Sequence, residues 1–168
     1  MRIYLGADRA GLKVENRVTA HLGARGYEVV HCGADPSDEI DDYPAFCIDT
    51  ALQTANDLGS LGILLGDNGN DEQIAANKAV GARCALAWNP ETARLARARL
   101  DAQLIGIGVQ MHTTEEVLAI VDAFITTPWS VEEHYFHRIH LIRQYDYARM
   151  ALRPNSFAAA VHAEEGAQ

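Results

Sequence analysis

The sequence lacks the features that mark several large classes of protein. It has no uninterrupted run of about 20 apolar residues and no apolar segment directly after Met1, so we expect neither a membrane-spanning helix nor a secretory signal. The chain has 14 Lys and Arg residues and 23 Asp and Glu residues, which give a formal net charge of −9. We therefore expect no basic stripe suited to nucleic acid. These absences predict a cytoplasmic protein with neither a nucleic-acid nor a membrane partner.

Cysteine is also scarce, and no metal or nucleotide motif is complete. The three cysteines are Cys32, Cys47 and Cys84. Their odd number and wide spacing, without a C-x-x-C pair, indicate reduced thiols rather than a disulfide framework. His134, His137 and His140 lie at i, i+3 and i+6, but no carboxylate or cysteine completes a recognisable metal set with them. No G-x-G-x-x-G follows the first expected strand, so we expect no dinucleotide, no other cofactor and no metal.

Short apolar runs alternate with longer amphipathic segments along most of the chain. The runs expected to form strands are 3–7, 27–31, 61–65, 84–88 and 103–108. The segments expected to form helices are 12–22, 45–53, 72–78, 91–100 and 114–126. The strands are almost uniformly apolar, as burial on both faces requires. The alternation therefore predicts an α/β fold in which helices cover both faces of a five-stranded parallel sheet.

The pattern changes near the C-terminus. Residues 131–150 form a long expected helix of mixed polarity that follows no strand, which predicts packing on a partner subunit. An Ala-rich stretch comes after it. We therefore predict a single domain over residues 1–152 and a loose tail over residues 153–168.

Ligands in such folds bind outside the carboxyl ends of the strands, where the strand order reverses. The candidate loops follow the first, third and fifth strands and read GADRAG, GDNGND and GIGVQMH. The second of these contains two glycines and opens a helix, a geometry that gathers backbone N–H groups and favours an anion. It nevertheless carries three carboxylates, those of Asp67, Asp71 and Glu72. We expect the function to lie in these loops.

The loops belong to a longer series of motifs. In chain order these are YLGAD-x-AG at 4–11, DDYPAF at 41–46, GNDEQIAANK at 69–78, GARCALAW at 81–88, AQLIGIG at 102–108 and TTPW at 126–129. The series resembles ribose-5-phosphate isomerase B, in the actinobacterial branch of the family that includes galactose-6-phosphate isomerase. The resemblance implies a Rossmann-like three-layer sandwich and a homodimer or dimer of dimers with active sites at the interface. It also implies metal-free interconversion of aldose and ketose phosphates through an enediolate.

The resemblance further implies roles for single residues. Glu72 matches the glutamate that is the catalytic base in this branch, and the neighbouring Asp71 is expected to raise the pKa of that carboxyl. The matching substrate-binding positions are Asp8, which contacts sugar hydroxyls, Tyr43 near the substrate, and Asn68, Gly69 and Asn70, whose loop amides support the enediolate. Structural roles are the alternative, because Glu72 can cap a helix and Asn, Asp and Gly are common in turns.

Several pocket positions depart from the family pattern. They are Asp67 and Asp71 in place of glycines, Asn68 in place of serine, Arg9, Arg99 and Tyr135 in place of histidines, Leu100 in place of asparagine, and Gln110 and His134 in place of phosphate-binding arginines. Arg138 keeps the third of those arginines. The histidine replaced by Arg99 is the one expected to open the sugar ring, and arginine cannot substitute for histidine in proton transfer. Arg9, Asp67, Asp71, Arg99, His134 and Arg138 remain candidate substrate contacts.

Three functions remain open. The redistributed charge favours a sugar-phosphate isomerase-like enzyme acting on a substrate other than ribose 5-phosphate, such as an open-chain sugar phosphate or a sugar acid held by Arg9 or Arg99. The second is a catalytically silent subunit or binding protein that pairs with an intact paralogue. The third is an ordinary ribose-5-phosphate isomerase.

Overall fold

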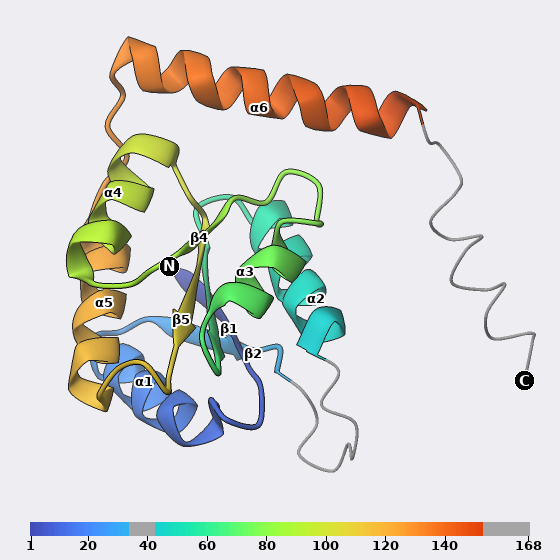
Figure 1. Cartoon of the computed structure of the whole chain (residues 1–168). Helices are drawn as coiled ribbons and strands as arrows, with labels where there is room; N and C mark the ends of the chain where they lie inside the picture. Colours follow the sequence, from blue (N-terminus) through green and yellow to red (C-terminus); the bar gives the residue numbers. More distant parts are fainter. Residues whose placement is uncertain (34–42, 153–168) are drawn as a thin grey trace, which may run out of the picture.

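The structure, a computed structural model, describes residues 1–33 and 43–152. Its strands are β1 (Arg2–Ala7), β2 (Glu28–His31), β3 (Leu61–Gly66), β4 (Cys84–Leu86) and β5 (Leu104–Gly108). Its helices are α1 (Leu12–Ala24), α2 (Tyr43–Asn56), α3 (Asn70–Ala76), α4 (Pro90–Leu100), α5 (Thr114–Thr126) and α6 (Glu133–Leu152). The strands form one sheet in the order β2-β1-β3-β5-β4, and every neighbouring pair is parallel. The predicted five-stranded parallel sheet is confirmed (Figure 1).

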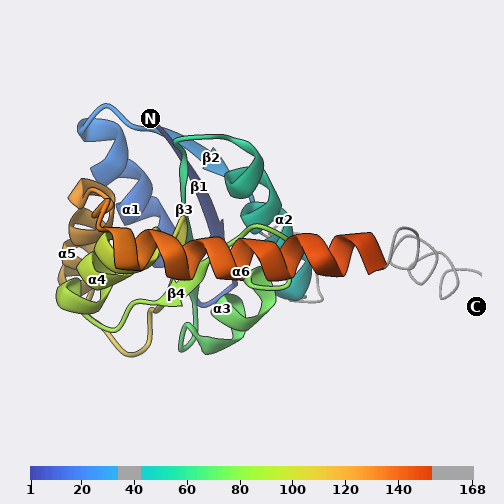
Figure 2. The ribbon, with the colours of Figure 1, turned by 90° about the horizontal axis from the view of Figure 1, so that it is seen from above.

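The sheet lies between two layers of helices (Figures 1 and 2). Helices α1, α4 and α5 cover one face, where Val18 and Phe124 are fully buried. Helices α2 and α3 cover the other, where Phe46 and Ala76 pack with Leu64 of β3. A fully buried large apolar side chain contributes about 1.5–3 kcal/mol relative to an exposed one. Burial on both faces is the reason that the strands are almost uniformly apolar.

Two helices begin with a capping box. Asn89 precedes Pro90 and its side chain accepts a hydrogen bond of 2.9 Å from the N–H of Thr92 at the start of α4. Thr113 caps α5 in the same way, accepting from Glu116 N at 3.2 Å while the Glu116 carboxylate accepts from Thr113 N. Both are capping boxes, which satisfy N–H groups that a helix end leaves without a partner.

The element boundaries differ from the predictions at several points. Helix α2 begins at Tyr43 rather than at residue 45, because Pro44 fits within a first helical turn. Helix α3 spans 70–76 rather than 72–78, since the Asn77 side chain instead bonds Cys84 N and Cys84 O and leads the chain into β4. Strand β4 ends at Leu86, two residues early. Much of the predicted loop at 32–44, and the predicted tail at 153–168, lie outside the described residues.

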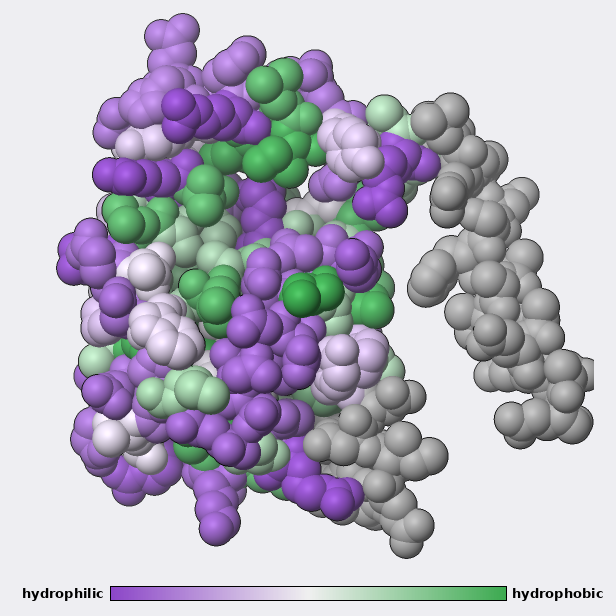
Figure 3. Space-filling view, viewed as in Figure 1, coloured by the Kyte–Doolittle hydropathy of each residue, from purple (hydrophilic) through white to green (hydrophobic). Residues whose placement is uncertain are grey.

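Helix α6 crosses the amino edge of the sheet, opposite the predicted ligand loops (Figures 1 and 2). The N–H of Ser130, before α6, donates to the carbonyl of Ala98 near the end of α4, and Asp146 accepts from the N–H of Gly81 before β4. Of the described α6 side chains only Ile139 is buried. The exposed large apolar ones are Phe136, Leu141, Ile142, Tyr145, Tyr147 and Met150. Figure 3 shows green apolar side chains among purple polar ones in this part of the surface.

No helix in residues 1–33 or 43–152 is both long enough and apolar enough to cross a bilayer.

Candidate active site

The three predicted loops meet at the carboxyl edge, because β1, β3 and β5 are neighbours in the sheet. The strand order reverses between β1 and β3, where parallel sheets of this kind bind ligands. Hydrogen bonds join the loops directly. Asp67 N donates to Asp8 Oδ2 at 3.2 Å, Val109 N to Gly66 O at 2.8 Å, and Gln110 N to Asp67 O at 3.2 Å. The loop after β3 is therefore held from both sides.

Gly69 makes the sharp bend at which the loop after β3 becomes α3. Its φ is 83°, in the left-handed region, and a Cβ on it would lie 2.9 Å from Gly108 N. Just before it, the Asn68 side chain accepts a hydrogen bond of 2.8 Å from Asn70 N. The bend thus places the start of α3 at the carboxyl edge, and the N–H groups of a helix start favour a negatively charged group.

Glu72 lies in the first turn of α3 and is only 2% exposed. Its Oε2 atom is buried and has no hydrogen-bond partner in the described part of the chain. The carboxylate occupies the space above Gly66, where a Cβ would lie 1.8 Å from Glu72 Oε1. A buried carboxylate oxygen without a hydrogen-bond donor lowers the stability of the folded protein. A catalytic role explains why such a group is kept.

The surroundings of Glu72 raise the pKa of its carboxyl. Burial is the main cause, and the negative charges of Asp8 and Asp71 act in the same direction, while backbone N–H groups of Glu72 and Gly69 oppose them. The predicted effect of Asp71 is therefore confirmed in direction, but burial is the larger cause. A carboxylate that binds a proton more readily is a better general base at neutral pH.

Two cysteines that the sequence analysis did not connect with the site, Cys47 and Cys84, lie close enough to Glu72 to be affected by its charge. Burial raises the pKa of both thiols above its ordinary value, and the charge of Glu72 adds to the effect at Cys47 and at Cys84. Both thiols therefore stay protonated and uncharged at neutral pH.

The other predicted residues of the carboxyl edge form the rim of the site. Asp8 is 8% exposed and its Oδ1 accepts a hydrogen bond of 2.7 Å from Gly11 N. Asn68 and Tyr43 are half-buried, and Tyr43 packs beside the core under α2. The exposed members of the rim are Arg9, Asp67, Asn70 and Asp71. The structure thus brings Asp8, the 67–71 loop and Glu72 together.

Within one chain the structure does not bring the remaining cations to Glu72. Arg99 lies in the last turn of α4, at the amino edge of the sheet. His134 and Arg138 lie on α6 above the same edge. A helix that follows a parallel strand runs back across the sheet, so its C-terminal end lies far from the carboxyl-edge loops. Any contact of these three residues with a Glu72 site must involve a second copy of the chain.

His112 is a residue of this edge that the sequence analysis did not single out. Its Nδ1 lies 2.8 Å from Gly108 O and its Nε2 lies 2.7 Å from Trp88 O, so the ring joins the ends of β5 and β4. Trp88 also packs edge-on against it, with 5.3 Å between ring centroids. The only sequence signal was its position in the GIGVQMH loop. No group of three or more His, Cys, Asp or Glu side chains within the described residues is placed to hold a metal ion.

Known proteins that are similar to this chain in sequence and fold belong to one family. Residues 3–142 match the family described as Ribose/Galactose Isomerase. Ribose-5-phosphate isomerase B of Mycobacterium tuberculosis is 58% identical over 146 residues, which cover 87% of this chain and 90% of that protein. The type B ribose 5-phosphate isomerase of Trypanosoma cruzi has a similar structure, with a TM-score of 0.82, 28% identity and coverage of 88% and 99%. So does ribose-5-phosphate isomerase B of Mycoplasma genitalium with bound ribulose-5-phosphate, with a TM-score of 0.81, 31% identity and coverage of 87% and 96%. The chain belongs to the ribose/galactose isomerase family, as its motifs predicted.

Proposed function

We propose that the protein is an aldose–ketose isomerase that interconverts ribose 5-phosphate and ribulose 5-phosphate. The observation that carries the proposal is the Glu72 carboxylate, buried and without a donor on Oε2, at the helix start where three strand-end loops meet. The 58% identity to a ribose-5-phosphate isomerase B supports this ordinary activity over the altered substrate that the sequence favoured.

The reaction needs one base that moves a proton between two neighbouring carbons. Glu72 is suited to remove the proton from C2 of the aldose and return it to C1, because its raised pKa favours proton capture. The enediolate formed between these steps carries negative charge on oxygen. The N–H groups at the bend around Gly69 supply the donors that stabilise such an oxyanion.

The phosphate requires cations that the carboxyl edge of one chain does not supply in a cluster. In the proposal, Arg138, His134 and Arg99 come from the partner of a homodimer. The exposed apolar side chains of α6, such as Phe136 and Ile142, support this assignment, because a helix whose described side chains are nearly all exposed gains stability when a partner covers them. The pocket is thereby completed only by association.

An altered substrate remains a second candidate on the strength of one feature. The carboxylates of Asp67 and Asp71 are exposed at the rim of a site proposed to receive a phosphate. A carboxylate 4 Å from a phosphate charge repels it by about 4 kcal/mol at an effective dielectric of 20. A sugar substrate with an amine or more hydroxyl groups would instead find acceptors there.

The test is an assay of ribose 5-phosphate conversion in deuterated buffer, in which NMR monitors the reaction. We expect the wild type to form ribulose 5-phosphate and Glu72→Gln to lose this activity. Parallel reactions contain other pentose and hexose phosphates and sugar acids. Turnover of one of these, with none of ribose 5-phosphate, contradicts the proposal and supports the altered substrate. No turnover with any of them supports the silent-subunit alternative.

A further inference from the structure

A cavity lies at the edge of the sheet opposite the candidate active site. Its volume is about 410 Å³, within the usual range for small-molecule sites. The turn between α2 and β3, the end of α4, the end of α5 and Arg143 of α6 form its walls. Strands β3 and β5 begin here, so the cavity is at the amino edge and contains none of the residues assigned to proton transfer.

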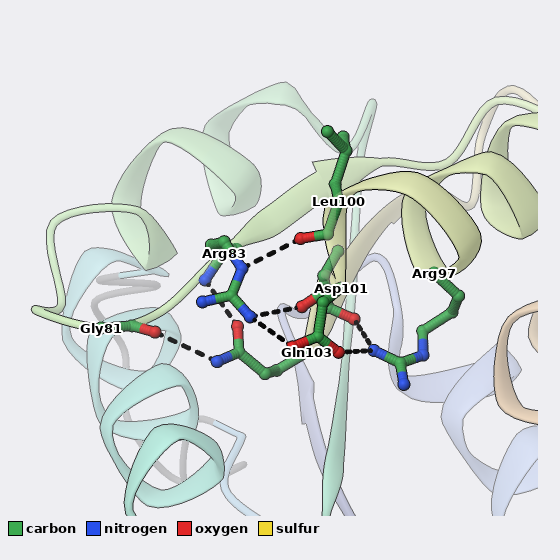
Figure 4. A network of polar contacts seen from close by, with 7 residues as sticks. Gly81, Arg83, Arg97, Leu100, Asp101 and Gln103 are labelled. Carbon is green, nitrogen blue, oxygen red and sulfur yellow. Dashed lines mark hydrogen bonds and ion pairs between the residues drawn. The ribbon is translucent and has the colours of Figure 1, made fainter. Parts of the chain in front are cut away.

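Asp101, which lines the cavity, is the centre of a network of polar contacts (Figure 4). Arg83 donates to Asp101 Oδ2 at 2.9 Å and Arg97 donates to Oδ1 at 3.0 Å. Arg83 also bonds the carbonyls of Leu100 and Asp101, and its backbone N–H bonds the Gln103 side chain. The two arginines leave Asp101 with its charge more than balanced.

The other carboxylate of the cavity already has cationic and hydroxyl partners. Asp57 accepts hydrogen bonds of 2.6 Å from Arg2 and 3.1 Å from the Tyr4 hydroxyl. The negative charges of Asp57 and Asp101, the two acids of the lining, are therefore both compensated by arginine. A ligand that enters meets two acids that are each bound to arginine.

Some arginine donors of the cavity, unlike its carboxylates, lack partners. Arg97 uses only Nη1, which donates to Asp101 (Figure 4) and to Ala102 O. Its Nε is buried and has no hydrogen-bond partner in the described structure. Arg143 makes no hydrogen bond or ion pair with residues 1–33 and 43–152. Burial lowers the pKa of Arg83, and the charges of Arg143 and Arg97 act in the same direction, so the three guanidinium groups lie near one another. An unpartnered buried donor requires a water or a ligand.

The hydroxyl groups of the lining complete the pattern. Ser60, Thr126 and Thr127 each donate their hydroxyl proton to a backbone carbonyl, at 2.7, 2.6 and 2.6 Å. Each of these oxygens has thereby used its proton and can act towards a ligand only as an acceptor. Arginine donors and hydroxyl acceptors in one cavity suit a compound with both an oxyanion and hydroxyl groups.

We propose that this amino-edge cavity binds a small phosphorylated polyhydroxy compound, with its phosphate between Arg97 and Arg143. Two guanidinium groups match the two charges of a phosphate monoester, and their planar donor forks bind its oxygens in pairs. The hydroxyl groups of the ligand donate to the side-chain oxygens of the α2–β3 turn and of the α5 end. The lining of this cavity shares no residue with the Glu72 site of the same chain, although α4 and α6, which contribute Arg97 and Arg143, are also the helices proposed to reach the site of the partner.

The experiment is an NMR titration of the full-length ¹⁵N-labelled protein with glycerol 3-phosphate. The Arg138→Gln background is used so that binding at the proposed active site is weakened. We expect saturable shifts of the backbone amides of Ser60, Gln103 and Thr127. Arg143→Gln should weaken binding at these amides by at least about tenfold, the loss of one charged hydrogen bond. Arg149→Gln, on the same helix but outside the cavity, is the matched control and should leave the affinity unchanged.

Three outcomes overturn the proposal. The first is the absence of saturable shifts at these amides up to about 20 mM ligand, twenty times a Kd of about 1 mM. The second is an equal affinity in the Arg143→Gln variant. The third is equally tight binding of malonate, a dicarboxylate of the same charge, which shows that the cavity does not select phosphate. Arg143 is exposed, so its substitution leaves the fold intact and each result is interpretable.

Discussion

The carboxylate of Glu72 occupies the space that a side chain on Gly66 would need. A Cβ at position 66 would lie 1.8 Å from Glu72 Oε1 and 2.0 Å from its Cδ. Non-bonded atoms do not come so close, so the last residue of β3 and the proposed base in α3 constrain each other. The glycine is thus required for the position of the carboxylate.

Substitution of Gly66 should therefore impair catalysis more than folding. We expect Gly66→Ala to lower kcat by about 100-fold, since a displacement of about 1 Å in a reacting group has that effect. Gly23→Ala is the matched control, because a Cβ there meets nothing within 4 Å and alanine is favoured within a helix. Steady-state kinetics and melting temperatures of the two variants check this. A Gly66→Ala enzyme with wild-type kcat contradicts the proposed position of the base.

The role of Glu72 is testable by removing its charge alone. Glu72→Gln should reduce proton exchange at the substrate carbon by about 10²–10⁴-fold, while the Kd for substrate changes only a few-fold. Asp71→Asn, at the exposed neighbour, is the control and should retain most of the activity. Deuterium incorporation from solvent is the measurement. If Glu72→Gln exchanges deuterium as fast as the wild type, the residue only caps the helix.

The raised pKa of Glu72 also predicts how stability depends on pH. The folded state binds this proton more readily than the unfolded state, whose Glu pKa is about 4.3. The contribution of the group is thus complete below that pH and is lost as the pH rises through the folded-state value. Glu72→Gln removes this titrating carboxyl. The Tm of the variant relative to wild type should therefore increase between about pH 4 and pH 8, by about 2–4 °C for each kcal/mol. A constant difference in calorimetry across this range contradicts the assignment.

The same shift predicts the acid limb of the activity profile. The wild-type rate should fall on acidification at a pH above the ordinary range for a glutamate, because the base becomes protonated there.

A site shared between two chains predicts complementation between inactive variants. In a mixed dimer of Glu72→Gln and Arg138→Gln chains, one of the two sites has both wild-type residues. Random pairing should restore about one quarter of the wild-type activity at low substrate concentration. Mixing Glu72→Gln with the double variant is the control and should restore none. A monomeric mass by light scattering, or no recovery in the mixture, contradicts the shared site.

The acidic rim predicts an effect on substrate affinity. Asp67→Gly/Asp71→Gly should lower KM for ribose 5-phosphate, with a smaller change in kcat, because two negative charges leave the path of an anionic substrate. The effect should shrink at high ionic strength. Glu28→Gln, an exposed acid at the amino edge, is the control for net charge. An unchanged KM at low salt contradicts any role of the rim in selectivity.

The sequence by itself determined the order of the elements, the parallel sheet and the loops that bear the site. These depend on local patterns, such as the apolar runs of β3 and β5 and the capping boxes of Asn89 and Thr113. The resemblance of its motifs to the isomerase family also indicated Glu72 as the candidate base.

Only the tertiary structure decided what surrounds that carboxylate and which cations lie away from it. The burial of Glu72 against Gly66 and beside Cys47 and Cys84 joins four segments of the chain, and burial is the main cause of its raised pKa. Arg99 belongs to α4, which starts at the carboxyl edge of the sheet and ends at the amino edge. Composition and residue spacing do not show that Arg99 lies at the amino edge. Contacts between residues distant in sequence arise from packing, and local preferences carry no information about them.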